Sequence, residues 1–425
     1  STSSGSGSSS GSTVTGCGAG GSTTISGTVF DPAGQVPLPN VWVYVPVDPA
    51  TLPPITTGTK SCSTCPSIGR YYAATQTNSG GAFSLSGLPA SSSLSVALQV
   101  GKWRRVVTVN IANQCGSNPV ASPTLRLPRN RSEGDIPQMA VLTGGADDLG
   151  CFLRAVGLDA SEYGAPQSGG RLDVYQGVQG PGLTTGTAGA CGSAAPVCPL
   201  WSSKAAFENY DIALLACEGG ENGNTKPVAS LQAMRDWLDE GGKVLATHFH
   251  YYWFKNSPQT DFQNVATWTG TSVGAGSGNY TIDTGSPGGT VFDQWLSGSA
   301  VSAATGTTIA LTGVADSVST FGPAPVRWVY DGNPSTIGTV TNHPKMFTFV
   351  TPIGGTGLSG DSGTGGYCGK VLFTDLHTSG SPSASVPGPC PTTLTAQQKA
   401  LEYLFFDLSA CVSGSSLPPA PPPSQ

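Results

Sequence analysis

Residues 243–256 read KVLATHFHYYWFKN and hold two of the chain's four histidines, His248 and His250. The apolar run VLAT predicts a strand that leads directly into His248. Side chains at positions i and i+2 of a strand point to the same side, so an HxH pair in extended chain can bind one ion. The spacing therefore predicts a metal site at the end of this strand.

Two other apolar runs also end in polar side chains. DIALLACEGG ends in Cys217 and Glu218, and GKVLFTDLHTS ends in Asp375 and His377. Three protein ligands and one open position describe a hydrolytic zinc site, in which the bound water has a pKa of about 7. We expect a divalent metal, zinc above others, with the ligands His248, His250 and His377.

The same residues suggest roles in catalysis. Glu218 is the candidate general base, and Asp375 or Glu218 is the fourth ligand or a carboxylate that orients a ligand. The expected catalytic residues are thus Glu218, His250 and Asp375. A second hypothesis is nucleophilic, with Cys217 beside a histidine as in Cys–His sites. The sequence does not show whether the fourth histidine, His343, lies near this set or far from it.

A structural explanation competes with these roles. The run Tyr251–Phe254 follows His250 directly, and imidazoles hydrogen-bonded beneath such rings would hold the sheet edge together without chemistry. The same rings beside a cleft would stack on sugars, which suits a polysaccharide or cell-surface partner. The loops ENGNTK (221–226) and DSGTGG (361–366) offer oxygen ligands for calcium but lack the EF-hand pattern.

Strands alternate with helices over residues 137–412. IPQMAVLTGG, RLDVYQG, DIALLACEGG, VLATHFH and GKVLFTDLHTS predict strands, and DDLGCFLRAVG, KPVASLQAMRDWLDEGG and LTAQQKALEYLFFDLSAC predict helices. Thr395 and Gln398 have the spacing of a capping box. Near-continuous apolar strands in this alternation predict a doubly wound parallel sheet covered on both faces. Ligands bind such sheets at the carboxyl ends of the strands. A strand-rich insertion is expected at about 255–345.

Residues 21–127 instead have a period of two. TTISGTVFD, VWVYVPV, GAFSLSGL, SLSVALQV and RRVVTVNI predict short strands separated by glycine and proline, which is typical of a β-sandwich. We divide the chain into a Ser/Gly-rich linker (1–20), this sandwich (21–127), a linker (128–136), the α/β domain (137–412) and a proline-rich tail (413–425).

The sandwich segment resembles the carboxypeptidase regulatory-like (transthyretin-like) family. The similarity lies in SGTVFDPAGQVPLPNVWVYV, TQTNSGGAFSLSGLP and LSVALQVGKW. The matching positions are Gly27, Val29, Asp31, Gly34, Pro37, Leu38 and Val41 in a first hairpin, and Thr77, Gly81, Phe83 and Leu88 in a central one. The resemblance implies a structural or adhesive module of secreted and cell-surface proteins.

The α/β segment resembles the class I glutamine-amidotransferase-like fold, in its trehalose-utilisation-protein-like branch. YDIALLACEGG, WLDEGGKVLATH and GKVLFTDLHTS carry the similarity. The amidotransferase nucleophile would fall within THFHYY, where the chain has no cysteine, and Cys217 lies one strand earlier. The resemblance therefore implies the fold without glutaminase activity. Both domains together are similar to a group of secreted myxobacterial-type proteins, which implies architecture and location but no reaction.

Composition narrows the class of protein. The chain has 425 residues, a formal charge of −6 and only 10% charged residues, which argues against a nucleic-acid partner. The one compact basic cluster, GKWRR (101–105), is expected at a solvated hairpin tip. No apolar run approaches the roughly 18 residues that a membrane span needs.

Eleven cysteines favour an oxidising compartment, and a start at Ser1 is what signal removal would leave, so we expect a secreted or cell-surface protein. Cys62 and Cys65, with Cys17 and Cys115, are expected in disulfides, and the preferred pairs in the α/β domain are Cys191–Cys198 and Cys390–Cys411.

Two functions remain open from the sequence. One is a histidine-lined pocket that binds a ligand or a metal, with metal-assisted hydrolysis of a saccharide or ester as the reaction class. The other is a non-catalytic adhesin or self-assembling filament subunit, because high Gly, Ser and Thr, low charge and many disulfides suit it equally. Electron microscopy of the purified protein distinguishes a filament from monodisperse particles.

Overall fold

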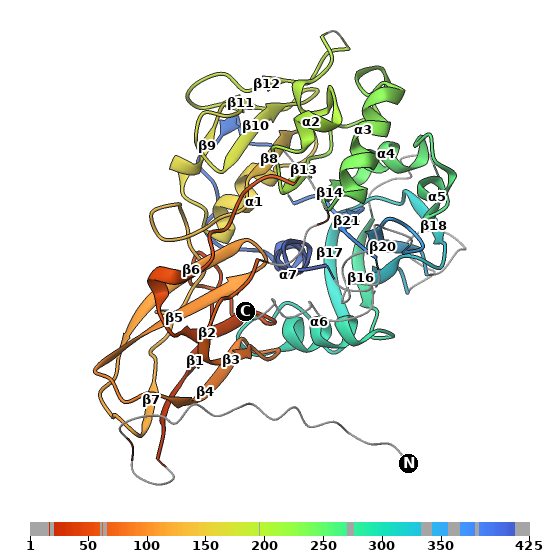
Figure 1. Ribbon diagram of the computed structural model, residues 1–425. Helices are drawn as coiled ribbons and strands as arrows, with labels where there is room; N and C mark the ends of the chain where they lie inside the picture. Colours follow the sequence, from red (N-terminus) through yellow and green to blue (C-terminus); the bar gives the residue numbers. More distant parts are fainter. Residues whose placement is uncertain are drawn as a thin grey trace.

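The computed structural model describes residues 17, 21–59, 62, 66–194, 196–269, 276–332, 342–355, 366–378 and 382–412. The chain is a mixed α/β protein with many strands and few helices. Apart from Cys17, the expected linker at 1–20 lies outside the described residues, as does the expected tail after residue 412. Figure 1 shows the N-terminal strands gathered on one side of the molecule and the helices on the other.

The N-terminal segment forms two sheets that share one core. The sheets have the orders β4-β1-β7 and β3-β2-β5-β6. Alternate residues of the strands, such as Ile25, Val43, Phe83 and Val96, are buried together, as the period of two predicts. The strands are β1 Thr23–Thr28, β2 Trp42–Pro46, β3 Tyr71–Gln76, β4 Ala82–Leu88, β5 Ser93–Val100, β6 Trp103–Asn110 and β7 Ser117–Pro119.

The rest of the chain is built on one large sheet with the order β12-β10-β8-β13-β14-β21-β20-β19-β16-β17, and β9 also pairs with β10. The strands from β12 to β21 are parallel, and those from β20 onward pair antiparallel. These strands are β8 Met139–Thr143, β9 Tyr163–Gly164, β10 Leu172–Gln176, β12 Gly189–Ala190, β13 Ile212–Leu215, β14 Lys243–Thr247, β16 Gly276–Ile282, β17 Thr308–Val314, β19 Val326–Tyr330, β20 Pro344–Thr351 and β21 Gly369–Thr374.

The expected insertion at about 255–345 contributes to this sheet. β16, β17 and β19 extend it beyond β20, so most of the insertion continues the sheet sideways instead of lying over its edge. Two short pairs stand apart from it: β11 Gly182–Leu183 with β22 Ser385–Val386, and β15 Ala266–Trp268 with β18 Val318–Phe321.

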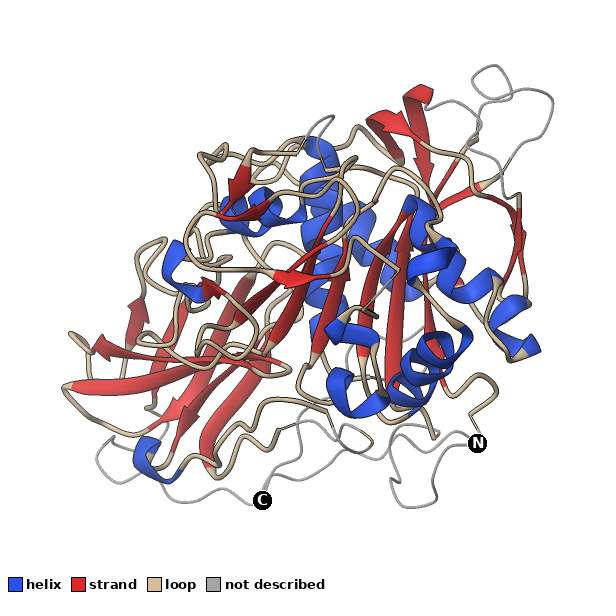
Figure 2. Cartoon of the chain, turned by 90° about the horizontal axis from the view of Figure 1, so that it is seen from above, coloured by secondary structure: helices blue, strands red, loops and turns tan. Residues whose placement is uncertain are grey.

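Helices cover both faces of the large sheet (Figure 2). Leu214 and Leu245 point to the core shared with α1, α6, α7 and the N-terminal sheets, whereas Leu215 and Ala246 point to the core shared with α2, α3, α4 and α5. Apolar side chains on both faces explain why these strands read as continuous apolar runs. The helices are α1 Leu149–Val156, α2 Lys204–Phe207, α3 Val228–Asp239, α4 Tyr252–Lys255, α5 Thr260–Gln263, α6 Pro287–Ser297 and α7 Ala396–Ser409.

Helix α7 joins the two halves of the molecule (Figure 1). It begins with the expected capping box, in which Thr395 and Gln398 bond reciprocally to backbone groups. Trp103 of β6 packs edge-on against Phe405 and Phe406 of α7. The N-terminal sheets and the α/β sheet therefore share one continuous apolar core.

The basic cluster GKWRR lies at this junction, so the expectation of a solvated hairpin tip is wrong. Gly101 is buried, and a Cβ at this position would lie 2.0 Å from the carbonyl oxygen of Ser409. Lys102 pairs with Asp211 of the α/β half, and the buried Arg104 bonds to the carbonyl oxygen of Pro53. Backbone and carboxylate oxygens surround the hairpin, and its basic side chains pair with them.

Four disulfides are described: Cys17–Cys115, Cys62–Cys368, Cys151–Cys390 and Cys191–Cys198. The pair Cys191–Cys198 is confirmed. The pair Cys390–Cys411 is wrong, because Cys390 reaches the first turn of α1 instead, and Cys411 is bonded elsewhere. Cys62–Cys368 links the two halves of the molecule, and Cys65 lies outside the described residues.

Within the described ranges, no helix combines the length and the apolar character that crossing a bilayer requires.

Candidate functional site

The ends of three neighbouring parallel strands meet at one edge of the large sheet. β13 leads to Cys217, β14 to His248 and β21 to His377. β14 lies between β13 and β21 and is parallel to both. The carboxyl ends therefore point to the same edge, where open parallel sheets bind ligands.

The chain turns sharply at His248. β14 ends at Thr247, and His248–Tyr251 form the 3₁₀ helix η5. The φ angle of His248 is +41°, in the left-handed region that costs a non-glycine residue on the order of 1 kcal/mol. Because the two histidines lie on a helical turn and not on a strand, the same-side argument does not apply to them.

The turn directs His248 toward Cys217 and His377. Its Nδ1 lies 3.5 Å from the Sγ of Cys217 and 3.2 Å from the Nε2 of His377. One ligand atom from each of the three residues lies within 4.8 Å of the other two, and no other group of this kind occurs among the described residues. Cys217 and His248 are buried, and His377 is partly exposed.

These distances suit one tetrahedral ion. Zinc bonds of about 2.05 Å to nitrogen and about 2.3 Å to sulfur place two nitrogens roughly 3.3 Å apart, and a nitrogen and a sulfur roughly 3.6 Å apart. The observed separations that involve His248 are 3.2 and 3.5 Å. The third separation, between the Sγ of Cys217 and the ring nitrogen of His377, is at most 4.8 Å. A zinc-sized cation fits among the three atoms once that separation closes to roughly 3.6 Å.

The burial of the site controls its protonation. Burial lowers the pKa of His248 to about 3, and the nearby ring of His377 lowers it further. Burial also raises the pKa of the Cys217 thiol to about 12. At neutral pH His248 is an uncharged imidazole, ready to bind a metal, whereas Cys217 keeps its proton until a cation displaces it.

His250 does not join this group. Its Nε2 bonds to the carbonyl oxygen of Ala216 at 2.9 Å, and its Nδ1 accepts from the indole N–H of Trp253 at 3.2 Å. Burial lowers its pKa to about 4, so the ring is neutral and both nitrogens are engaged. Of the three expected histidine ligands, the structure brings together His248 and His377 but not His250.

Glu218 is held in a buried ion pair. Its Oε2 lies 2.6 Å from the Nζ of Lys226, and both side chains have no exposed surface. Its Oε1 accepts from the backbone N–H of Val178 at 2.8 Å. A carboxylate with both oxygens engaged in this way is poorly placed to take a proton from water.

Asp375 is buried at the end of β21. One of its oxygens accepts from the backbone N–H of Ser317, and the other has no hydrogen-bond partner among the described residues. Burial raises its pKa, and the charge of Lys345 opposes that rise. Of the three expected catalytic residues, Asp375 is thus the one with an oxygen still available.

His343 belongs to a different cluster. Its Nδ1 lies 2.8 Å from a carboxylate oxygen of Asp316, which also pairs with the buried Lys345. The Asp316 carboxylate fixes the imidazole from one side, so His343 contributes no atom to the group around Cys217.

The aromatic run after His250 is core. Tyr251, Trp253 and Phe254 are almost fully buried, and Tyr252 is half-buried. The hydroxyl of Tyr251 donates to Glu221 in the loop 221–226. These rings therefore support the floor of the site instead of offering a platform for sugars, and Glu221 is engaged instead of free for calcium. Most of the second calcium candidate, 361–366, lies outside the described residues.

Two buried charged residues near the site escaped the sequence analysis. Lys226 neutralises Glu218, and Asp147 lies in the loop after β8 beside Cys217. The available signal for Asp147 was the acidic pair Asp147-Asp148 after the glycines of TGG, since polar residues at the end of a parallel strand are candidates by position alone.

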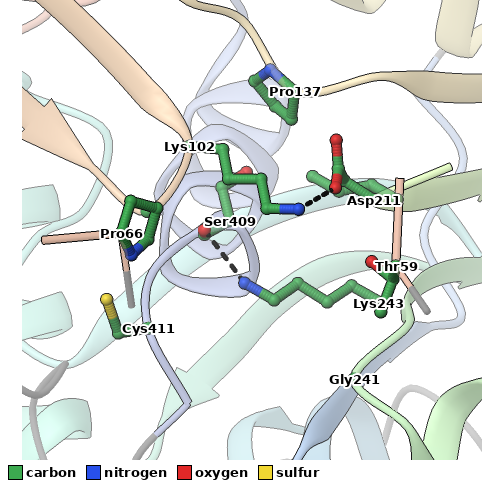
Figure 3. Close-up of a pocket in the computed structure, with 11 residues that line it drawn as sticks. Thr59, Pro66, Lys102, Pro137, Asp211, Gly241, Lys243, Ser409 and Cys411 are labelled. Carbon is green, nitrogen blue, oxygen red and sulfur yellow. Dashed lines mark hydrogen bonds and ion pairs between the residues drawn. The ribbon is translucent and has the colours of Figure 1, made fainter. Parts of the chain in front are cut away.

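A separate recess lies at the opposite, amino edge of the sheet (Figure 3). It is a shallow recess of about 350 Å³, open to solvent, between the two halves of the molecule. Lys102 pairs there with Asp211, and Lys243 donates to the carbonyl oxygens of Ser409 and Ala410 at the end of α7. Burial lowers the pKa of Lys243 to about 7, and the charge of Lys102 lowers it further.

Comparison with known proteins adds little. No protein-family model matches the chain, and no curated protein matches it. A solved structure described as a thua-like protein from Bacteroides uniformis is 9% identical, with a TM-score of 0.35, over 66% of this chain and 94% of its own. The protein STM3548 from Salmonella typhimurium, described as cytoplasmic, is 10% identical, with a TM-score of 0.31, over 63% and 98%.

The pilin subunit BcpA from Bacillus cereus is 11% identical, with a TM-score of 0.16, over 25% of this chain and 30% of its own. Similarities this low carry no argument about function.

Proposed function

We propose that Cys217, His248 and His377 form a binding site for a divalent metal ion, with zinc as the best-suited ion. The observation that carries the proposal is the convergence of one sulfur and two nitrogens within 4.8 Å at the carboxyl edge of the sheet. Thiolate and imidazole ligands favour zinc over magnesium or calcium, which prefer oxygen.

The chemistry of the cysteines supports the proposal. Cys217 is the free cysteine among the described residues, whereas the other nine described cysteines are disulfide-bonded. A nucleophile would need a thiolate at neutral pH, and a nearby cation or base to produce it. Burial raises the pKa of Cys217 to about 12 instead, so the thiolate forms only where a bound cation displaces the proton.

Three protein ligands leave one position of a tetrahedral ion for water or for a substrate oxygen. His377 is the partly exposed member, so solvent reaches the site from its side. The reaction class that suits this arrangement is metal-assisted hydrolysis, with an ester or a saccharide as substrate. Asp375 interacts with Ser317 and with Lys345 and Asp316 of the His343 cluster, and it is retained as a candidate for proton transfer on its free oxygen alone. Glu218 and His250 are not retained because their polar atoms are engaged.

We also propose that the protein works outside the cell, with the N-terminal segment as a carboxypeptidase regulatory-like module. The four described disulfides support an oxidising compartment, and the two N-terminal sheets support the module. The division into a module at 21–127 and an α/β domain at 137–412 belongs to the same proposal.

Metal analysis tests the proposed site. The full chain, stripped with chelator and dialysed against zinc, is expected to retain about one zinc per chain by elemental analysis. C217S and H377A should each weaken binding at least about 100-fold, because each removes one of three ligands. The matched control is H343Q, which alters the histidine of the Asp316 cluster. Wild-type protein that retains no zinc, or C217S that retains it fully, would overturn the proposal.

A further inference from the structure

The loop after β8 lies directly on the metal-site residues. The backbone N–H of Ala146 donates to the carbonyl oxygen of Cys217 at 3.0 Å. A Cβ at Gly144 would lie 2.1 Å from that same oxygen, so this close approach requires glycine. The loop therefore delivers the next residue, Asp147, to the neighbourhood of Cys217.

Asp147 is also tied to the other two ligand-bearing segments. Its Oδ1 accepts from the backbone N–H of Thr378 at 2.7 Å and from the Thr378 hydroxyl, and Thr378 follows His377. The hydroxyl of Thr247, the residue before His248, also interacts with the carboxylate. The carboxylate thus interacts with the strand ends that carry His377 and His248, and the loop that holds it bonds to the third, at Cys217.

The second oxygen of Asp147 is buried without a hydrogen bond of ordinary geometry. Asp147 is 1% exposed, and its Oδ2 has no hydrogen-bond partner among the described residues. An unpaired buried carboxylate oxygen is costly, and such groups are found mainly where a ligand, an ion or water completes them. His377 and Cys217 both interact electrostatically with this carboxylate.

The charges of the proposed site point to the same residue. A divalent cation bound by one thiolate and two neutral imidazoles leaves a net charge of +1 in a buried environment. One further carboxylate would neutralise it, which lowers the cost of burial. Asp147 is not itself within 4.8 Å of all three ligand atoms, so it acts from the second layer around the ion.

We infer that Asp147 is a positioning residue of the metal site: it fixes the segment of His377 through its bonds to Thr378 and supplies the balancing negative charge. The inference rests on the proposed function. Carboxylates that orient a histidine ligand in this way change metal affinity by about 10- to 100-fold when they are removed.

The neighbouring Asp148 provides a matched control. It lies in the same loop and carries the same charge, but its oxygens accept from the backbone N–H groups of Cys151 and Ser383. It caps α1 and leaves no oxygen for the metal site. D147N and D148N therefore make the same chemical change one residue apart, with different expected results.

The experiment is a competition titration of the full chain with zinc, followed by the absorption spectrum of the cobalt(II) form. D147N is expected to raise the Kd for zinc about 10- to 100-fold and to shift the cobalt bands, while D148N stays within about threefold of wild type. T378V removes only the hydroxyl that holds Oδ1, and should weaken binding about 3- to 10-fold. Thermal unfolding of each variant shows that it is folded.

The outcomes separate the inference from the proposed function. If the wild type binds zinc and D147N binds it with the same Kd and the same cobalt spectrum, the inference is overturned and the three-ligand site stands. If D147N does not fold, T378V decides, and a wild-type Kd for T378V overturns the inference. If the wild type binds no zinc, both the site and the role of Asp147 are overturned.

Discussion

The recess at the amino edge of the large sheet and the candidate site at its carboxyl edge differ in how their ionisable groups are paired. At the amino edge, Lys102 pairs with Asp211, and Lys243 donates to two carbonyl oxygens of α7. At the carboxyl edge, the Nε2 of His248 and the Oδ2 of Asp147 are buried without hydrogen-bond partners among the described residues. The recess of Figure 3 lies at the edge where these charges are paired.

This difference shows that a recess is weaker evidence for a site than unsatisfied polar atoms. Folding pairs buried polar groups where it can, because an unpaired one costs about 1–3 kcal/mol. Paired groups at the amino edge hold the two halves of the molecule together. Unpaired groups at the carboxyl edge are retained despite their cost, as expected of groups that await a ligand.

Helix α7 connects the two edges. Near its start, Gln397 donates to the carbonyl oxygen of His377 and Gln398 to that of Thr378. At its end, it receives the bonds from Lys243. Because the same helix bonds to both edges, the effects of substitutions at the two edges on stability and on zinc affinity can be compared directly.

The largest effect, counting both stability and zinc affinity, is expected from two glycines, one at each edge. G101A would place a Cβ 2.0 Å from Ser409 O, at a φ of +52°, and G144A would place one 2.1 Å from Cys217 O. Each overlap should cost roughly 3 kcal/mol of unfolding free energy. Zinc affinity should fall in G144A and stay unchanged in folded G101A. Denaturant unfolding measures the loss of stability, and zinc titration measures the affinity for the ion. Equal zinc affinities in the two variants would contradict the expectation that only the carboxyl edge holds the metal site.

The next effect concerns Lys243. Burial lowers its pKa in the folded state to about 7, whereas it is about 10.4 in an unfolded chain. Its contribution to stability is fully present above about pH 10.4 and is lost as the pH falls through 7, by on the order of 4–5 kcal/mol. Stability of K243M relative to wild type should therefore change between pH 7 and 10. K204M, which alters the partly exposed pair with Glu240, is the control and should show little of this change.

A smaller effect of opposite sign is expected midway along α7. Asp31 and Glu402 are both fully buried and interact electrostatically. Burial raises the pKa of Asp31 to about 6 and that of Glu402 well above its usual value, and Lys399 opposes the latter shift.

The stabilisation by this carboxyl pair is fully present below about pH 4 and is lost as the pH rises through 6 and beyond, by roughly 2 kcal/mol. E402Q keeps a hydrogen-bond donor without a titrating proton, so its stability should fall less than that of wild type between pH 4 and 8. Parallel stability curves for the two proteins would show that the carboxyls do not share a proton.

The smallest effect should come from His250. Its nitrogens are used by Ala216 and Trp253, so H250N should leave the Kd for zinc within about threefold of wild type, in contrast with H377A. A loss of zinc binding as large as that in H377A would mean that His250 turns toward the ion, and would restore the HxH site.

The sequence predicted the sheet edge well and the ligand set in part. Apolar runs of four to six residues located β13, β14 and β21, and the parallel arrangement placed Cys217, His248 and His377 at one edge. The expectation that His248 and His250 lie on a strand is wrong, because the strand ends at Thr247 and His248 has a positive φ. That local conformation depends on the packing of the aromatic residues that follow, which periodicity does not report.

The sequence by itself determined the alternation of strands and helices, the short cysteine pair Cys191–Cys198 and the edge of the sheet where polar side chains collect, because these follow from local periodicity and short chain closure. Only the tertiary structure decided which polar atoms are paired. Asp147, Cys217 and His377 are far apart in the chain, and their approach depends on how parallel strands and α7 pack, so burial and hydrogen-bond satisfaction are properties of the fold as a whole.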